Sequence, residues 1–144
     1  MNRITALVIA AALVTCASPA PAAGSSEPLT ITWTKTEAGC PSSVFTGTAS
    51  GDVSGALTAR RISDIASAGS TLHFVFHYTI GSSFEATVRA IFNTETGTAV
   101  VNGTVTGGHL SGAQLHGRAR VIGQTACGGF ILAGQFHVMP ASAG

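Results

Sequence analysis

Strand-like segments follow one another along most of the chain, and their spacing constrains the fold more than any other feature. Each segment alternates apolar and polar residues and is separated from the next by small turn residues, as in antiparallel sheets. The clearest hairpin joins Thr71–Ile80 to Phe84–Asn93 through Gly81-Ser82-Ser83. No segment has the apolar spacing of an amphipathic helix. The sequence therefore predicts an all-β domain.

The number of strands depends on the stretch from Thr98 to His116. Asn102-Gly103 is a strong hairpin signal, and a turn there would give nine strands. Gly107–Gly112 is a better connector, and a glycine inside a long strand lets a small barrel bend. We therefore expect one strand over Thr98–Thr106 and eight in all. In chain order these are Leu29–Thr36, Val44–Gly51, Gly55–Ala66, Thr71–Ile80, Phe84–Asn93, Thr98–Thr106, Ala113–Gly123 and Gly129–Met139.

Eight antiparallel strands of this length are expected to close into an up-and-down, calycin-type β-barrel, because closure removes the exposed sheet edges. Cys40 falls in the first loop and Cys127 in the seventh, so both lie at the same end of such a barrel. Closure makes the first and last strands neighbours and brings the two loops together. We predict a disulfide between these cysteines, contributing about 4 kcal/mol by closing a long loop. A nine-strand count would put Cys127 at the opposite end.

The N-terminus has the three parts of a secretory signal peptide over residues 1–23. Arg3 is followed by the apolar run Ile4–Val14 and by the small residues Ala20-Pro21-Ala22. A stretch ending at Cys16 resembles a bacterial lipoprotein box, so a lipid anchor there is the alternative. We expect a secreted or periplasmic protein with a short linker over 24–28, a barrel domain over 29–140 and a tail over 141–144.

Composition and motifs exclude several classes of function. The chain has seven Lys and Arg against six Asp and Glu, and removal of Arg3 makes the balance neutral. Nucleic acids and anionic membranes select basic proteins, so we expect neither as a partner. His73 and His77 share a strand face, but four residues of strand span roughly 13 Å, too far for one metal ion. The sequence has no phosphate loop, dinucleotide fingerprint or Gly-x-Ser-x-Gly turn. We expect no cofactor and no metal.

Alternation also sorts the side chains that face the lumen. The expected inner faces mix aromatic rings with Ala and Gly, which lets rings interdigitate in a narrow barrel. They comprise Leu72, Phe74, Phe76 and Tyr78; Phe84, Ala86, Val88, Ala90 and Phe92; Ala113, Leu115, Gly117, Ala119 and Val121; and Phe130, Leu132, Gly134, Phe136 and Val138.

Arg60 and Arg61 are adjacent in the third strand, so one of them must point inward unless a bulge places both at the rim. The more apolar face of this strand contains Leu57 and Ala59 and sends Arg61 inward. A buried guanidinium needs a partner, and no acidic residue falls on the inner faces assigned above. We therefore expect a ligand's anionic group near Arg61, Tyr78 or Trp33, with the rim position as the alternative.

Three stretches resemble the allene oxide cyclase barrel-like family, which is related to dirigent proteins. They are FTGTASGDVSGALTARRI, LHFVFHYTIGSSFEATVRAIFNTETGTAVVNGTVTGGHLSGAQLHGRARV and CGGFILAGQFHVMP. The resemblance implies a barrel that holds apolar molecules in its lumen. It also implies a homotrimer, in which the outward His73, Val75 and Ile131 would pack against other subunits. Plant cyclases of this group rely on an inward carboxylate, whereas Glu85 is expected to face outward here.

The sequence thus favours an exported binding module for a small apolar or amphipathic ligand, with Arg61, Tyr78 and Trp33 as ligand-binding residues. One alternative is an isomerase or cyclase of the same fold acting on an apolar substrate. Another is a structural or protease-inhibitor-like barrel whose lumen is filled by its own side chains. The volume of the lumen separates this last class from the other two.

Overall fold

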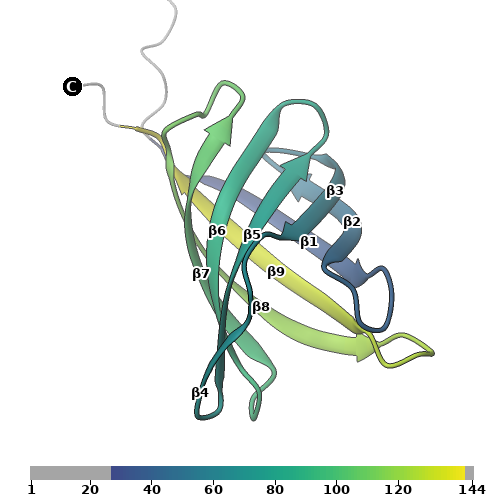
Figure 1. Cartoon of the computed structure of the whole chain (residues 1–144). Coiled ribbons are helices and arrows are strands. Elements are labelled where there is room, and N and C mark those ends of the chain that lie inside the picture. Colours follow the sequence, from purple (N-terminus) through teal and green to yellow (C-terminus); the bar gives the residue numbers. More distant parts are fainter. Residues whose placement is uncertain (1–26, 142–144) are drawn as a thin grey trace, which may run out of the picture.

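The computed structural model describes residues 27–141, which form a closed antiparallel β-barrel without a helix (Figure 1). Its nine strands are β1 (Leu29–Glu37), β2 (Val44–Gly51), β3 (Gly55–Arg61), β4 (Ala66–Ala68), β5 (Thr71–Ile80), β6 (Phe84–Asn93), β7 (Thr98–Gly107), β8 (Gln114–Gln124) and β9 (Phe130–Met139). Among the described residues, no helix is long and apolar enough to cross a membrane. The predicted signal peptide, the candidate lipid site Cys16 and residues 142–144 lie outside the described residues.

Eight of the strands form the ring. Their order is β3-β2-β1-β9-β8-β7-β6-β5, and β3 pairs with β5 to close it. Every pairing is antiparallel, and the first and last strands of the ring in sequence, β1 and β9, are neighbours. The predicted eight-stranded up-and-down barrel is confirmed.

The stretch that decided the strand count is a single strand, β7. Asn102 and Gly103 pair on both sides, with β6 and with β8, so they form no turn. A Cβ atom on Gly103 would collide with the backbone oxygen of Thr87 on β6. Glycine is required here because the two strand backbones approach closely, as expected where a small barrel bends.

The ninth strand comes from the region predicted to be one long third strand over Gly55–Ala66, and there the prediction is wrong. β3 ends at Arg61, and β4 pairs with the first residues of β5, outside the ring. Between them, the Ser63 hydroxyl accepts a hydrogen bond of 2.8 Å from the backbone N–H of Val75. The Ser63 side chain thus takes the place of a backbone carbonyl as the acceptor for β5. Backbone pairing with β5 stops after Arg61 and resumes at Ala66.

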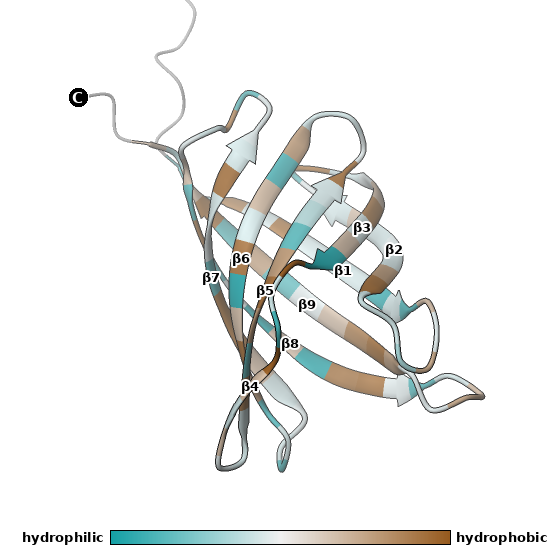
Figure 2. Ribbon diagram, in the orientation of Figure 1, coloured by the Kyte–Doolittle hydropathy of each residue, from teal (hydrophilic) through white to brown (hydrophobic). Residues whose placement is uncertain are grey.

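The two ends of the barrel differ. The closed end lies beside the connections β2–β3, β5–β6 and β7–β8, and the open end beside β1–β2, β6–β7 and β8–β9. Figure 2 shows hydrophobic and hydrophilic residues alternating along β6, where Phe84, Ala86, Val88 and Ala90 at alternate positions are buried. Seven inward side chains at the closed end are at most 1% exposed: Ile31, Leu57, Ile80, Phe84, Val105, Leu115 and Val138.

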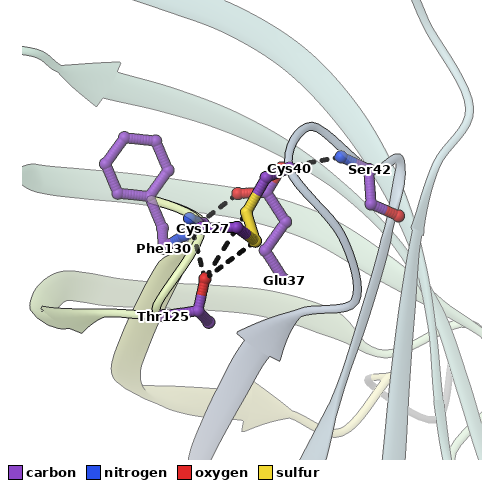
Figure 3. Close-up of a disulfide and its surroundings, with 7 residues drawn as sticks. Glu37, Cys40, Ser42, Thr125, Cys127 and Phe130 are labelled. Carbon is purple, nitrogen blue, oxygen red and sulfur yellow. Dashed lines mark hydrogen bonds between the residues drawn. A yellow bond between two sulfur atoms is a disulfide. The ribbon is translucent and has the colours of Figure 1, made fainter.

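A disulfide joins Cys40 in the β1–β2 connection to Cys127 in the β8–β9 connection at the open end (Figure 3). Their Cα atoms are 5.8 Å apart and the sequence separation is 87 residues. The predicted bridge across the β1–β9 seam is confirmed, and it is compatible with an oxidising extracellular or periplasmic location. Beside it, the Glu37 carboxylate accepts hydrogen bonds from the backbone N–H groups of Ser42, at 2.8 Å, and Phe130, at 3.0 Å. One side chain and one covalent bond therefore tie these loops together.

Candidate ligand-binding site

The open end of the lumen contains a cavity of about 620 Å³. All eight ring strands contribute to its wall, which is mostly apolar. At three inward positions on β6, β7 and β8 the residue is alanine, so side chains leave space that larger residues would fill. Seven aromatic residues line the cavity through strands β1, β2, β5, β6 and β9: Trp33, Phe45, Phe74, Phe76, Tyr78, Phe92 and Phe130.

Lys35 is the single lysine of the chain, and it lines this cavity. It lies on β1, two residues after Trp33, and only 3% of it is exposed. Its Nζ atom donates a hydrogen bond to the Tyr78 hydroxyl oxygen on β5. In the part of the chain that the structure describes, Lys35 forms no ion pair. A buried amine without a counter-ion is uncommon in proteins, where buried charges are ordinarily paired.

Aromatic rings surround the Lys35 amine. Nζ lies 4.0 Å from the ring centroid of Phe76, 4.6 Å from that of Tyr78, 4.8 Å from that of Phe45 and 5.2 Å from the Trp33 ring. Such contacts attract the charged form of the amine, but they recover only part of the cost of removing it from water. Burial lowers the pKa of Lys35 to about 7.

Tyr78 is the direct polar partner of this amine and is fully buried. Burial raises the pKa of its phenol, because the phenolate would lose its hydration. The hydroxyl is therefore neutral at physiological pH. At neutral pH the cavity thus contains a partly deprotonated amine beside a phenol that can both accept and donate a hydrogen bond.

Trp33 lies deep in the cavity and is 2% exposed. Its indole packs across the β1–β9 seam against Gly134, where a Cβ atom would overlap the ring. The ring centroids of Trp33 and Tyr78 are 6.0 Å apart. The Trp33 Nε1–H is buried and has no hydrogen-bond acceptor among residues 27–141. Such a donor is costly to leave unpaired, so it marks a place where an acceptor on a bound molecule would be stabilised.

Arg61 ends β3 at the open end and lines the same cavity, half-buried. The pairing of β3 with β5 runs without interruption through Arg60 and Arg61, so no bulge separates the two arginines. Arg60 faces outward and is exposed. The structure therefore brings all three sequence-predicted residues to one cavity, with Trp33 and Tyr78 deep inside and Arg61 at the strand end.

Two charged cavity residues of β1 were missed by the sequence reasoning: Lys35 and Glu37. Both continue the inward alternation of Ile31 and Trp33, so the signal was present in the first strand. Glu95 of the β6–β7 connection is exposed and also lines the cavity. The inner faces assigned from the sequence contained no acidic residue, because they left out β1 and its Glu37. Its two carboxylate oxygens are engaged by backbone N–H groups, so it braces the loops of the open end.

The histidines of β5 do not gather into a metal site within the described residues. No group of three or more His, Cys, Asp or Glu there could hold a metal ion. His77 lies on the outer surface, with its Nε2 atom 3.9 Å from Glu85 Oε2. Glu85 is exposed on the outer face, as the alternation predicts.

No family model, curated protein or solved structure matches this chain.

Proposed function

We propose that this protein is an exported binding protein that holds one small, mainly apolar ligand at the open end of its barrel. The observation that carries the proposal is the cavity of about 620 Å³ with a buried lysine in its wall, which has no ion-pair partner among residues 27–141. Ligand sites in proteins are typically about 300 to 1,000 Å³, mostly apolar, with a few polar groups that orient the ligand. A lumen filled by its own side chains would leave no such space.

The polar groups of the cavity favour an amphipathic ligand over a pure hydrocarbon. Lys35 Nζ and Trp33 Nε1 both present N–H donors among aromatic rings, and neither has a carboxylate partner in the described part of the chain. An oxygen atom on the ligand would satisfy these donors, while its carbon skeleton would pack against Phe74, Phe76 and Phe92. Arg61 offers a second cation to a ligand whose anionic group lies toward the strand ends.

Export, family membership and assembly are parts of the same proposal. The disulfide is consistent with export from the cytoplasm by the predicted signal peptide, or with the lipid anchor at Cys16. The eight-stranded ring is the architecture that a resemblance to the allene oxide cyclase barrel-like family implies. A homotrimer stays a prediction of that resemblance.

An isomerase or cyclase of an apolar substrate is the second candidate, and Lys35 is the observation that favours it. Such an enzyme needs a group in the lumen that can take and return a proton near neutral pH. The pKa of Lys35, lowered to about 7 by burial, meets this requirement. Conversion of a bound ligand, lost in Lys35→Met, would favour the enzyme over the binding protein.

Fluorescence of the single tryptophan, Trp33, tests the binding proposal because its ring lies in the cavity wall. The purified protein is titrated with decanol and with decanoate, which differ only in their polar head group. We expect a saturable change in Trp33 emission with at least one of them. The absence of a saturable change with both would contradict the proposal.

Two adjacent positions on β6 provide a matched pair of variants. Ala90→Leu adds bulk inside the cavity, whereas Ile91→Leu alters an outward side chain that is 38% exposed. We expect Ala90→Leu to weaken binding at least tenfold and Ile91→Leu to leave it unchanged. Equal affinities in the two variants would place the ligand outside the lumen.

A further inference from the structure

The one lysine of this chain lies inside the barrel instead of on its surface, where lysines normally lie. We propose that Lys35 is a covalent carbonyl-binding residue, whose amine condenses with the aldehyde or ketone group of an apolar ligand to form an imine. This inference rests on the proposed function, because the carbonyl compound must first enter the cavity. It specifies the chemistry of the ligand's polar head.

Imine formation requires an amine with a free lone pair, and the surroundings of Lys35 favour that form. The neighbouring β2, β5 and β1 place the rings of Phe45, Phe76 and Trp33 around Nζ at centroid distances of 4.8, 4.0 and 5.2 Å. An apolar site of this kind disfavours the ammonium ion and activates the amine as a nucleophile.

The charged and titratable groups near Lys35 supply no counter-ion. On its own strand, Glu37 is held by the backbone N–H groups of Ser42 and Phe130. From β3, Arg61 adds a positive charge to the same cavity, and from β5, Tyr78 is neutral. Glu95 of the β6–β7 connection also lines the cavity, but it is exposed and forms no ion pair with Lys35. The inward side chains that β2 and β9 contribute to the cavity are all apolar. A salt bridge that would keep the amine protonated is therefore absent from the described residues.

Tyr78 is placed to assist the reaction as a proton donor and acceptor. The Lys35 nitrogen attacks the carbonyl carbon, a C–N bond forms, and the carbonyl π electrons move to oxygen to give a carbinolamine. The nitrogen then loses its protons, the oxygen is protonated and leaves as water, and the C=N bond forms. One water is released and no oxidant or reductant is consumed. The Tyr78 hydroxyl, already hydrogen-bonded to Nζ, is within reach of these proton transfers and can donate to the imine nitrogen afterwards.

Reductive trapping tests this inference directly. The protein is incubated with decanal and sodium cyanoborohydride at neutral pH, and its mass and tryptic peptides are measured. We expect a mass increase of one decyl group located on Lys35, which also blocks tryptic cleavage after that residue. Because the chain has one lysine, the N-terminal amine is the other site to be examined, and the peptide map separates the two.

Variants of the two residues sharpen the test. Lys35→Arg keeps a cation in the cavity but forms no stable imine, so the adduct should be lost. Tyr78→Phe keeps the ring and removes the hydroxyl, and should slow adduct formation by about 100-fold if the hydroxyl relays protons. An adduct on the N-terminus alone, or one that forms equally fast in urea-unfolded protein, would overturn the inference.

Decanol distinguishes the failure of this inference from the failure of the proposed function. If decanol binds and changes Trp33 emission but decanal leaves no adduct on Lys35, the barrel is a binding protein and the covalent inference is wrong. Binding of decanoate alone, with no decanal adduct, would assign Lys35 to an ion pair with a ligand carboxylate and would also overturn it. If none of the three probes binds, both proposals fail.

Discussion

The two ends of the barrel are built from the same strands but serve different purposes. On β6, the inward side chains run from Phe84 at the closed end, 1% exposed, to Ala90 beside the cavity. On β8 they run from Leu115, which is fully buried, to Ala119 beside the cavity. Large side chains fill the closed end. At the open end, alanines on β6, β7 and β8 leave room between the aromatic rings, and a disulfide joins two of the loops. The fold is stabilised at one end, and the space for a ligand is kept at the other.

The largest expected effect compares one phenylalanine from each end. Phe84→Ala removes a fully packed ring at the closed end and should lower the free energy of unfolding by about 4 kcal/mol. Phe74→Ala removes a half-buried ring from the cavity wall, where contacts are fewer, and should cost about 1 kcal/mol. Urea unfolding with the disulfide intact measures both values. Equal losses would mean that the open end is packed as tightly as the closed end.

Removal of the disulfide should loosen the open end. In the double variant Cys40→Ala, Cys127→Ala, we expect the free energy of unfolding to fall by about 4 kcal/mol, because the bridge constrains a separation of 87 residues in the unfolded chain. Hydrogen exchange should then rise in the β1–β2 and β8–β9 connections and stay unchanged at the closed end. Exchange that rises uniformly along all strands would contradict this division of the molecule.

The pH dependence of stability should report the buried amine. Burial lowers the pKa of Lys35 to about 7 in the folded protein, from its ordinary value of 10.5. Between these values the unfolded chain binds more protons, so the free energy of unfolding should rise with pH, by about 2 kcal/mol from pH 7 to pH 9. Above pH 10 the raised pKa of Tyr78 makes the free energy of unfolding fall with pH, so the protein and the variant are compared below pH 10. Lys35→Met should lack this rise, and an identical slope in the variant would exclude Lys35 as its source.

The smallest effect is expected on the outer surface. Glu85 Oε2 lies 3.9 Å from His77 Nε2, and the two side chains are 54% and 36% exposed. Exposed pairs of this kind contribute little, so Glu85→Ala should change the free energy of unfolding by no more than about 0.5 kcal/mol. Urea unfolding of Glu85→Ala, measured alongside Phe84→Ala, gives this value. A loss as large as that of a core variant would show that the outer face contributes to the fold.

Local patterns in the sequence were sufficient to predict the eight-stranded ring and the disulfide. Alternation of apolar and polar residues assigned the inner faces of β6 and β8. Cys40 and Cys127 were placed at the same end because they lie in the first and seventh loops, and alternate loops of an up-and-down barrel share an end. Gly103 was correctly interpreted as part of one strand, because the turn residues that follow it are better connectors.

What sequence patterns missed depends on contacts between distant residues. The break after Arg61 depends on the Ser63 hydroxyl bonding to Val75, which becomes visible only when β3 and β5 are paired. Lys35 occupies an inward position by alternation, but a lysine near a strand end normally extends its amine to water. Its burial follows from the rings of β2 and β5, which the closed barrel brings around it.

The central claim is that the open end holds a lysine amine inside a cavity, away from water. With lysine labelled by carbon-13 at Cε, the chain gives one lysine signal, because Lys35 is its single lysine. The chemical shift of this signal is followed against pH in the ligand-free protein. The account predicts a titration midpoint near pH 7, as burial of the amine requires. A midpoint near the ordinary lysine value of about 10.4 would show a hydrated amine and would contradict the account.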